Sequence, residues 1–240
     1  MKKLFTLILL AAAVQTTSAQ SIAALQQQYT NFIINAHTQF GKSDKADFVD
    51  GSDNRFFGKD WVKGGVVNNY GSELSKGFEF NYDFMRQELY AKWSDTVIVV
   101  DPRTVKYFYL NTPTGTKYFV KNFELDGKGE KFYESLAFED IATDSAGVKL
   151  LKFRSVKRIR ANKNDYAANF SGDYSDTFSN SFDYYVITPD GKYKKVKLTK
   201  KDIVNALSAY PKLKNVNVGA VPDQLSEDAA AVFIEKLNHS

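Results

Sequence analysis

Six basic side chains have the types and spacing that most directly suggest chemistry. They are Lys152, Arg154, Arg158, Arg160, Lys195 and Lys197. The first four occupy even positions of one segment, so a regular strand would place them on one face. Clustered positive charge attracts anions, and we therefore predict a basic patch that binds an anionic glycan, the phosphates of lipopolysaccharide or a protein partner.

The charge distribution along the chain supports this prediction but also offers an alternative. Residues 148–201 hold 13 bases and 5 acids, a net charge of +8. Residues 44–147 hold 18 acids and 13 bases, a net charge of −5. The bases of the first segment would then pair with acids of neighbouring strands on an ordinary solvated face, where each pair contributes little.

Few residues suit metal binding or catalysis. The chain has no Cys and only two His, His37 and His239. Neither a G-x-S-x-G turn nor a glycine-rich phosphate loop is present. We therefore expect no catalytic triad, no transition-metal site and no cofactor.

A group of oxygen-bearing side chains is the remaining metal candidate. Asp47, Asp50, Asp53 and Asn54 lie close together, as in a calcium loop. A twelve-residue loop of that type needs Glu at its last position, which counted from Asp50 is Trp61. We interpret the segment as a solvated loop.

The elements that must position the basic residues are mainly strands. Apolar and polar residues alternate from Phe78 to Phe84 and again from Leu89 to Trp93, which is typical of strands with one face in a core and one in water. Further strands are predicted over 61–67, 97–100, 105–110, 117–125, 130–138 and 148–160. Asp101-Pro102 predicts a tight turn. The residues expected in the interior are Phe78, Phe80, Tyr82, Phe84, Leu89, Ala91 and Trp93.

Helices are predicted at both ends of this sheet. Apolar residues recur at three- and four-residue steps over 21–40. Thr199 is placed to cap a second helix that ends at Tyr210-Pro211, and Ser226 to cap a third. Before Thr199, the sequence predicts a loop over 161–181 and a hairpin with strands over 182–188 and 193–198. The fold class predicted is mainly β (α+β): one antiparallel meander of nine or ten strands, curved or closed, with an N-terminal helix and C-terminal helices packed on it.

The N-terminus predicts export. Lys2 and Lys3 precede an apolar run from Leu4 to Val14, and Thr17-Ser18-Ala19 offers a cleavage site, so residues 1–19 are predicted to be a signal peptide. Residues 20–240 then form one domain with no transmembrane segment. The absence of Cys excludes a lipid-modified N-terminal Cys. We expect a periplasmic or cell-surface protein, for which nucleic acid is not an expected partner.

The order of motifs adds a resemblance. W-V-K-G-G-V-V, G-F-E-F-N-Y-D-F-M-R-Q-E-L, F-Y-E-S-L and V-K-L-L-K-F follow one another between residues 60 and 210. Together with the export signal they resemble a group of uncharacterised exported proteins common in Bacteroidetes, for which no activity is known. The order of elements is also similar to that of periplasmic lipoprotein carriers, which implies a half-barrel around an apolar ligand.

Three functions follow as hypotheses. The first is a non-enzymatic exported protein that binds a partner. The second is a carrier of lipid or another apolar molecule in a half-barrel cavity. The third is a hydrolase with a carboxylate pair, for which no catalytic residue is predicted, because Glu79 and Asp83 lie four residues apart on one strand face and do not by themselves indicate such a pair. An apolar cavity would favour the carrier, and a cleft with converging acids would favour the hydrolase. A filled core with neither would leave the binding protein.

Overall fold

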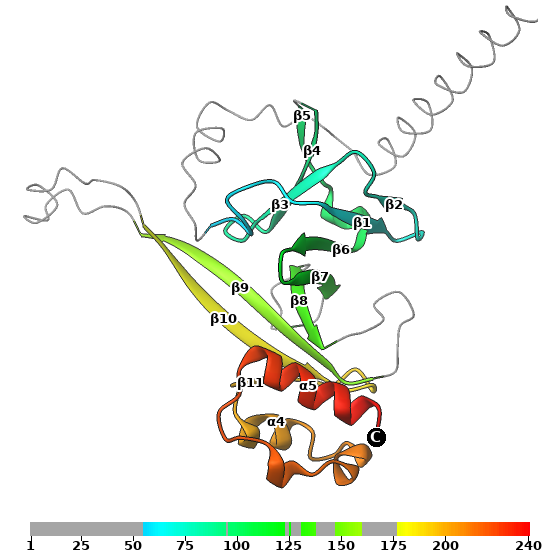
Figure 1. The fold of residues 1–240 in the computed structure, drawn as a ribbon, viewed down its shortest axis with the longest axis vertical. Coiled ribbons are helices and arrows are strands. Elements are labelled where there is room, and N and C mark those ends of the chain that lie inside the picture. Colours follow the sequence, from blue (N-terminus) through cyan, green and yellow to red (C-terminus); the bar gives the residue numbers. More distant parts are fainter. Residues whose placement is uncertain (1–54, 95, 123–124, 126–130, 138–146, 160–176) are drawn as a thin grey trace, which may run out of the picture.

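The computed structural model describes residues 55–94, 96–122, 125, 131–137, 147–159 and 177–240. They form a mainly β structure with two antiparallel sheets and two α-helices (Figure 1). The predicted signal peptide, the predicted helix over 21–40 and Arg160 of the predicted basic patch lie outside the described residues. So does the segment from Asp47 to Asn54.

The larger sheet has eight strands in the order β11-β10-β9-β8-β7-β6-β1-β2. Each neighbouring pair is antiparallel, and tight turns join three of the seven pairs, β1–β2, β6–β7 and β10–β11. The strands are β1 (Gly64–Asn68), β2 (Glu73–Leu74), β6 (Val105–Thr112), β7 (Gly115–Asn122), β8 (Lys131–Ala137), β9 (Lys149–Ile159), β10 (Thr177–Ile187) and β11 (Tyr193–Val196).

The smaller sheet contains β3 (Glu79–Asp83), β4 (Glu88–Trp93) and β5 (Thr96–Val99) in sequence order. The prediction of one continuous meander, curved or closed, is therefore wrong: the described strands form two sheets and no closed barrel. The chain leaves the larger sheet between β2 and β3 and returns to it after Asp101, whose side chain caps the 3₁₀ helix η1 (Pro102–Thr104). The turn at η1 directs the chain from the smaller sheet into β6 of the larger one. The sequence did not predict this division, because alternation within a strand does not show which other strand it pairs with.

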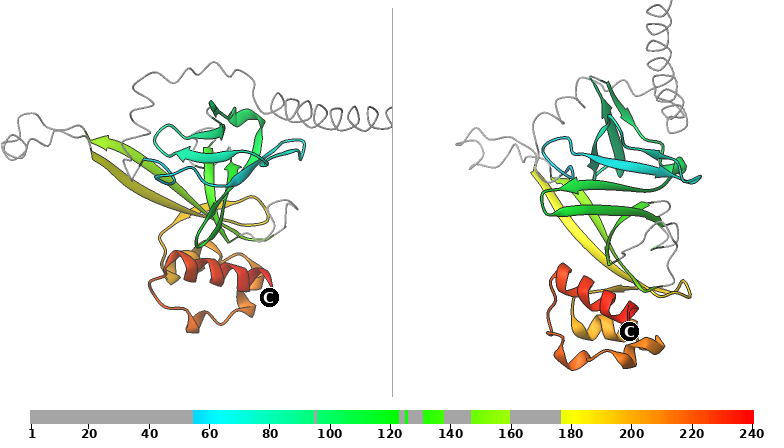
Figure 2. Two further views of the ribbon diagram at one scale, coloured as in Figure 1. Left: turned by 45° about the horizontal axis from the view of Figure 1, so that its top comes forward. Right: turned by 45° about the vertical axis from the view of Figure 1, so that its right-hand side comes forward.

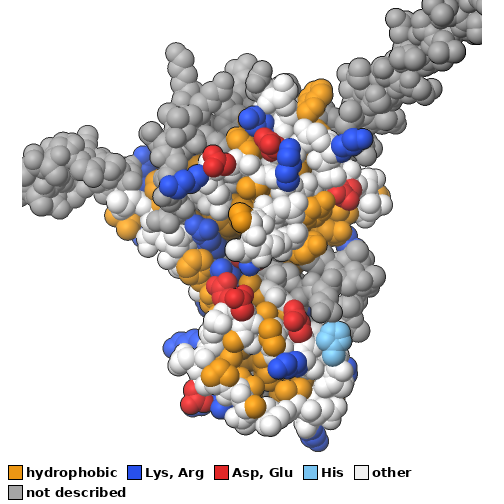
Figure 3. Space-filling model, in the orientation of Figure 1, with side chains coloured by type: hydrophobic (Ala, Val, Ile, Leu, Met, Phe, Trp, Pro, Cys, Tyr) orange, Lys and Arg blue, Asp and Glu red, His pale blue; other side chains and the backbone are white. Residues whose placement is uncertain are grey.

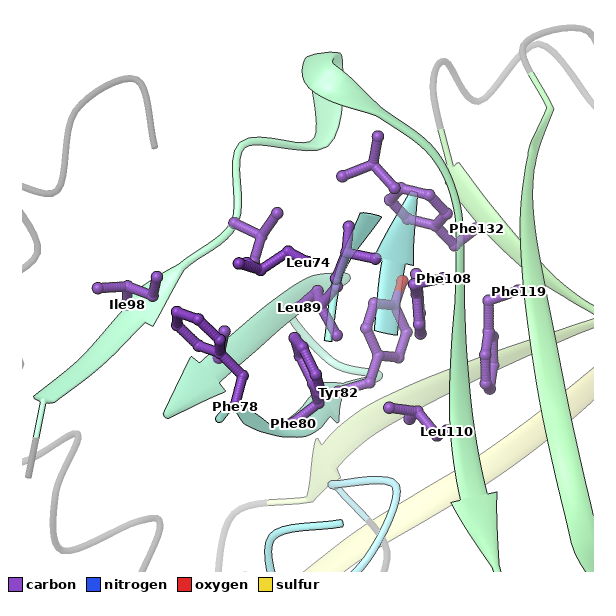
Figure 4. Close-up of a cluster of buried hydrophobic side chains, with 14 of the residues drawn as sticks. Leu74, Phe78, Phe80, Tyr82, Leu89, Ile98, Phe108, Leu110, Phe119 and Phe132 are labelled. Carbon is purple, nitrogen blue, oxygen red and sulfur yellow. The ribbon is translucent and has the colours of Figure 1, made fainter. Parts of the chain in front are cut away.

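A cluster of aromatic rings fills the space between the two sheets (Figure 4). Tyr82 of β3 lies 5.2 Å from Phe108 of β6, centroid to centroid, and Phe108 stacks on Phe119 of β7 at 4.6 Å. Phe80, Tyr82 and Phe108 are fully buried. The predicted interior positions are confirmed except for Trp93, which is 45% exposed. Trp93 is the last residue of β4, where its ring stacks on the outside of Phe78 at a centroid distance of 6.3 Å.

The polar face of β3 is also buried, which the alternation did not predict. Asn81 and Asp83 are 1% and 0% exposed. Residues before β1 cover them, since Phe56 bridges Asp83 and the amide of Asn81 donates to the Gly58 carbonyl at 2.9 Å. The Arg55 guanidinium donates to Asp83 Oδ2 at 2.7 and 2.9 Å, so the buried carboxylate is neutralised. A covering segment of this kind replaces water with specific partners.

The C-terminal part is helical, as predicted. Thr199 accepts from the Asp202 amide as N-cap of α4 (Lys200–Ala206), and Ser226 caps α5 (Glu227–Asn238) in the same way. α4 ends four residues before the Tyr210-Pro211 boundary that the sequence predicted. Short 3₁₀ helices, η3 (Pro211–Asn215) and η4 (Val218–Ala220), connect α4 to α5.

β9 and β10 form a long ribbon whose side chains contribute to three cores (Figure 2). On one face, Val156 contacts the aromatic cluster between the sheets, whereas Leu150 and Val186 pack under α4 and α5. A third core on the opposite face includes Leu151 and Tyr185. β10 begins at Thr177, so the end of the predicted loop over 161–181 is strand. Its residues Thr177–Ser181 are mostly polar, and their pairing with β9 is what makes them a strand.

Candidate functional site

The register divides the described members of the predicted basic patch between the two faces of the sheet. Lys152 lies opposite Tyr184, and Tyr184 lies opposite Val196 of β11. Lys195 is next to Val196 along the strand and therefore points to the other face, where its ammonium pairs with Asp183 at 2.8 Å. The two groups of bases do not converge. The prediction that the bases of one segment share a face is consistent with the register, but spacing within a segment does not show which face of the sheet each segment uses.

Lys152 is the centre of a polar cluster at the junction of the two cores. Glu134, Lys152 and Tyr184 lie directly opposite one another on β8, β9 and β10. The Lys152 ammonium is 3.5 Å from Glu134 and 2.9 Å from Glu227 in the first turn of α5. Figure 3 shows acidic and basic side chains side by side where α5 meets the ribbon. The cluster fixes the N-terminal end of the helix to the sheet.

The Glu227 carboxylate accepts from both Lys152 Nζ and the Tyr184 hydroxyl, at 2.9 and 2.7 Å. Burial raises the pKa of this carboxyl, but the hydrogen bonds from Lys152 and Tyr184 outweigh burial and hold the pKa below its ordinary value. Burial and the bond to Glu227 raise the pKa of Tyr184. Glu227 is therefore a charged anchor, and the cluster has the character of a structural ion network.

Arg154 has a structural position as well. Its guanidinium carbon lies 4.2 Å from the centroid of Phe84, and its Nε donates to Asn180 at 2.9 Å. Burial lowers the pKa of Arg154. The side chain thus joins the ribbon to the smaller sheet. Arg158, near the end of β9, and Lys197, just after β11, are exposed.

The two acids that share one face of β3, Glu79 and Asp83, are also held by cations. Glu79 pairs with Lys63 at 3.3 Å, and Asp83 is buried against Arg55 at 2.7 Å. A carboxylate pair for glycoside hydrolysis must flank a scissile bond across an open site. These two side chains do not offer such a site, because Asp83 is 0% exposed.

A cleft at the end of the β10–β11 hairpin is the candidate binding site. Its volume is about 430 Å³, within the range of about 300–1,000 Å³ that small-molecule sites occupy. One wall is the hairpin, and the other is the C-terminal end of α4 with the start of η3. The lining residues are Val186, Thr188, Pro189, Asp190, Lys192, Tyr193, Lys194, Ala206, Ala209, Tyr210 and Pro211.

The register explains how the cleft obtains its charge. Val186 and Lys194 are opposite each other on β10 and β11, and both face the cleft. Lys192 pairs with Asp190 at 2.7 Å in the turn, and hydrogen bonds from Lys192 and Thr188 lower the pKa of Asp190 to about 2. Within the part of the chain that the structure describes, no hydrogen bond or ion pair engages the Lys194 ammonium.

Sequence reasoning selected Lys195 and Lys197 on this hairpin and missed Lys194. A signal for Lys194 was present: Val186 and Val196 mark the face of the hairpin that turns toward α4, and Lys194 shares the phase of Val196. The aromatic contribution of Tyr210 had no such signal, because it depends on where α4 ends.

Neither metal nor membrane features appear among the described residues. No group of three or more His, Cys, Asp and Glu side chains in this part of the chain is arranged to hold a metal ion. No described helix is long and apolar enough to cross a membrane. Comparison of the chain with models of protein families, with curated proteins and with solved structures found no match.

Proposed function

We propose that this chain is a non-enzymatic exported protein that binds an acidic glycan in the cleft between the β10–β11 hairpin and α4. The observation that carries the proposal is the Lys194 ammonium, which faces the cleft without a counter-ion among the described residues. An unpaired cation in a concave site favours an anionic ligand. The periplasm or the cell surface, where such glycans occur, is the location that the N-terminal sequence predicts.

The cleft also carries the groups that a sugar needs. Tyr193 is 42% exposed, and Tyr210 lies on the opposite wall. A tyrosine ring offers an apolar face for the C–H side of a pyranose and a hydroxyl for its polar edge. Thr188 adds a hydroxyl at the turn. A carboxylate or sulfate of the sugar would then meet Lys194.

The interior supports this proposal over an apolar carrier. Tyr82, Phe108 and Phe119 form ring contacts at 4.6 to 5.7 Å in the space where a half-barrel would hold its ligand. Rings in such contact pack as a core. Because rings fill the space between the sheets, a ligand would bind at the surface, as in the proposed cleft, rather than inside a half-barrel.

Heparin chromatography tests the proposal, since heparin is a sulfated acidic glycan. We expect Lys194→Glu to elute at a lower salt concentration than the wild type. Lys157→Glu is the matched control, because Lys157 is exposed on β9 and changes the net charge equally. If the two variants elute together, any retention reflects net charge alone and the cleft is not the site. Binding should also weaken as salt rises above about 0.15 M, where the screening length is about 8 Å.

A further inference from the structure

A second surface lies on the opposite side of the molecule's larger sheet from the aromatic core. The register places Gly65 of β1, Tyr109 of β6 and Tyr118 of β7 directly opposite one another on this outer face. A Cβ atom on Gly65 would come within 2.7 Å of the Tyr109 ring. Glycine at this position therefore lets the ring lie flat against the sheet, which fixes its orientation.

The two tyrosines form a short platform. Their ring centroids are 5.9 Å apart, and the ring planes are inclined by 45°. Tyr118 is 37% exposed. The Tyr109 hydroxyl donates to Glu73 Oε1 at 2.6 Å. Burial, and then the bond to Glu73, raise the pKa of Tyr109 to about 12, so its hydroxyl remains protonated and the ring is held from its outer end.

Tyr118 of the platform is exposed, whereas other described residues cover the same face further along the sheet. Further along the same face, Leu151 and Tyr185 belong to the third core, which Leu125 closes. Figure 3 shows hydrophobic side chains at the surface over β1 and β6, beside an acidic side chain near β2. Aromatic side chains that stay at a surface and are oriented by a hydrogen bond are typical of binding sites.

The chemistry around the rings favours a sugar over a protein. Glu73 borders Tyr109, and its carboxylate accepts the hydrogen bond of the Tyr109 hydroxyl at the edge of the ring. Thr116 donates to Asn111 at 2.9 Å on the exposed ends of β7 and β6. Apolar ring faces with hydroxyl and carboxylate groups at their edges match a pyranose, whose C–H groups lie on its faces and whose hydroxyls lie on its rim. A stable protein interface would need about 800 Å² per partner with an apolar centre.

We propose that Tyr109, Tyr118 and Glu73 form a binding platform for a neutral, linear oligosaccharide whose chain curves. The spacing of the rings allows two consecutive sugar units to stack. The 45° inclination requires the second unit to turn relative to the first. An α-1,4-linked glucan curves in this way, whereas a flat β-1,4-linked glucan would contact one ring at a time. The platform is independent of the cleft and does not rest on its proposed function.

Isothermal titration calorimetry of the purified protein with maltoheptaose tests this proposal, with cellohexaose as the flat comparison. We expect maltoheptaose to bind and Tyr118→Ala to weaken it about tenfold, equivalent to about 1.4 kcal/mol. Tyr70→Ala is the matched control, because Tyr70 is 93% exposed and lies in the β1–β2 turn, and it is not one of the two rings of the platform. Its affinity should equal that of the wild type.

A second variant separates the ring from its anchor. Tyr109→Phe keeps the ring but removes the hydroxyl that donates to Glu73, and it should weaken binding by less than Tyr118→Ala. Far-UV circular dichroism confirms that each variant is folded. The proposal is overturned if maltoheptaose does not bind, if cellohexaose binds equally well, or if Tyr118→Ala and Tyr70→Ala behave alike. Lys194→Glu should leave maltoheptaose binding unchanged, which distinguishes this outcome from a failure of the cleft.

Discussion

Asp83 and Arg55 form a buried ion pair, and replacing either residue has a large predicted effect on stability. Their side chains are 0% and 3% exposed and meet at 2.7 Å. Asp83→Asn keeps the shape and an oxygen for the amides of Met85 and Arg86 but leaves the Arg55 cation without its carboxylate. Removing one member of a buried pair costs about 3–5 kcal/mol, and we expect that loss in urea unfolding.

The pair is best separated from its surroundings by a double-mutant cycle. Arg55→Met alone and Asp83→Asn alone should each destabilise the protein. The double variant should lose less than the sum of the two, by about 1 kcal/mol or more, because each single variant already removes the shared interaction. Strict additivity would show that the two side chains act independently.

Phe80 and Trp93 test the corrected boundary of the aromatic core. Phe80 is 0% exposed and Trp93 is 45% exposed, although both belong to the same alternating pattern. Phe80→Ala should therefore cost about 3–5 kcal/mol in the free energy of unfolding. Trp93→Ala should cost much less, since its ring covers Phe78 from outside. If the two variants lose equal free energy of unfolding in a urea titration, Trp93 is part of the core and the corrected boundary is wrong.

At the scale of elements, the attachment of α5 depends on pH through Glu227. Its pKa is lower in the folded protein than the value of about 4.3 for an unperturbed Glu. The stabilisation is therefore present above the unfolded pKa and is lost as the pH falls through the folded pKa. Glu227→Gln should cost about 1 kcal/mol at pH 7, a modest value because the group is half-exposed. The cost should shrink as the pH falls through the folded pKa of Glu227.

Asp228→Asn is the matched control for that experiment. Asp228 shares the first turn of α5 and its helix dipole, but it is exposed and is not one of the two carboxylates that bind Lys152. Thermal unfolding at pH 7 and pH 3 should show a pH-dependent difference for Glu227→Gln that exceeds the difference for Asp228→Asn. Equal pH profiles would mean that the dipole, rather than Lys152, holds the Glu227 carboxylate.

The same scale shows what the sequence could and could not predict. Alternation located most of the strands, and the capping residues Thr199 and Ser226 located two helix starts, because both signals are local. The division into two sheets depends on which strands pair, and the burial of Asn81 depends on a distant covering segment. The sequence did not predict the cleft for the same reason. The face of the sheet to which Lys194 points depends on the register of β11 with β10 and of β10 with β9.

Among the described residues, two of the three cores lie along one face of the ribbon, on either side of the cluster around Lys152. The aromatic core lies between the sheets, and the second core lies between the ribbon and the helices. Asn238 near the end of α5 adds a second attachment, because its side chain exchanges two hydrogen bonds with the backbone of Val148 at 2.8 and 3.0 Å. The helices are thus held to the ribbon at both ends of α5. Because they pack in a separate core, we expect that they can unfold without disruption of the aromatic core.

Leu237→Ala tests whether the two cores unfold separately. Leu237 is 0% exposed in the second core, so its truncation should cost about 2–5 kcal/mol there. If the cores are separate units, amide hydrogen exchange should accelerate in α4 and α5 while β3, β4 and β6 keep their wild-type protection. Phe80→Ala, in the aromatic core, should give the reverse pattern. If either variant accelerates exchange equally in all of these elements, the ribbon couples the two cores into one cooperative unit and the polar cluster does not divide them.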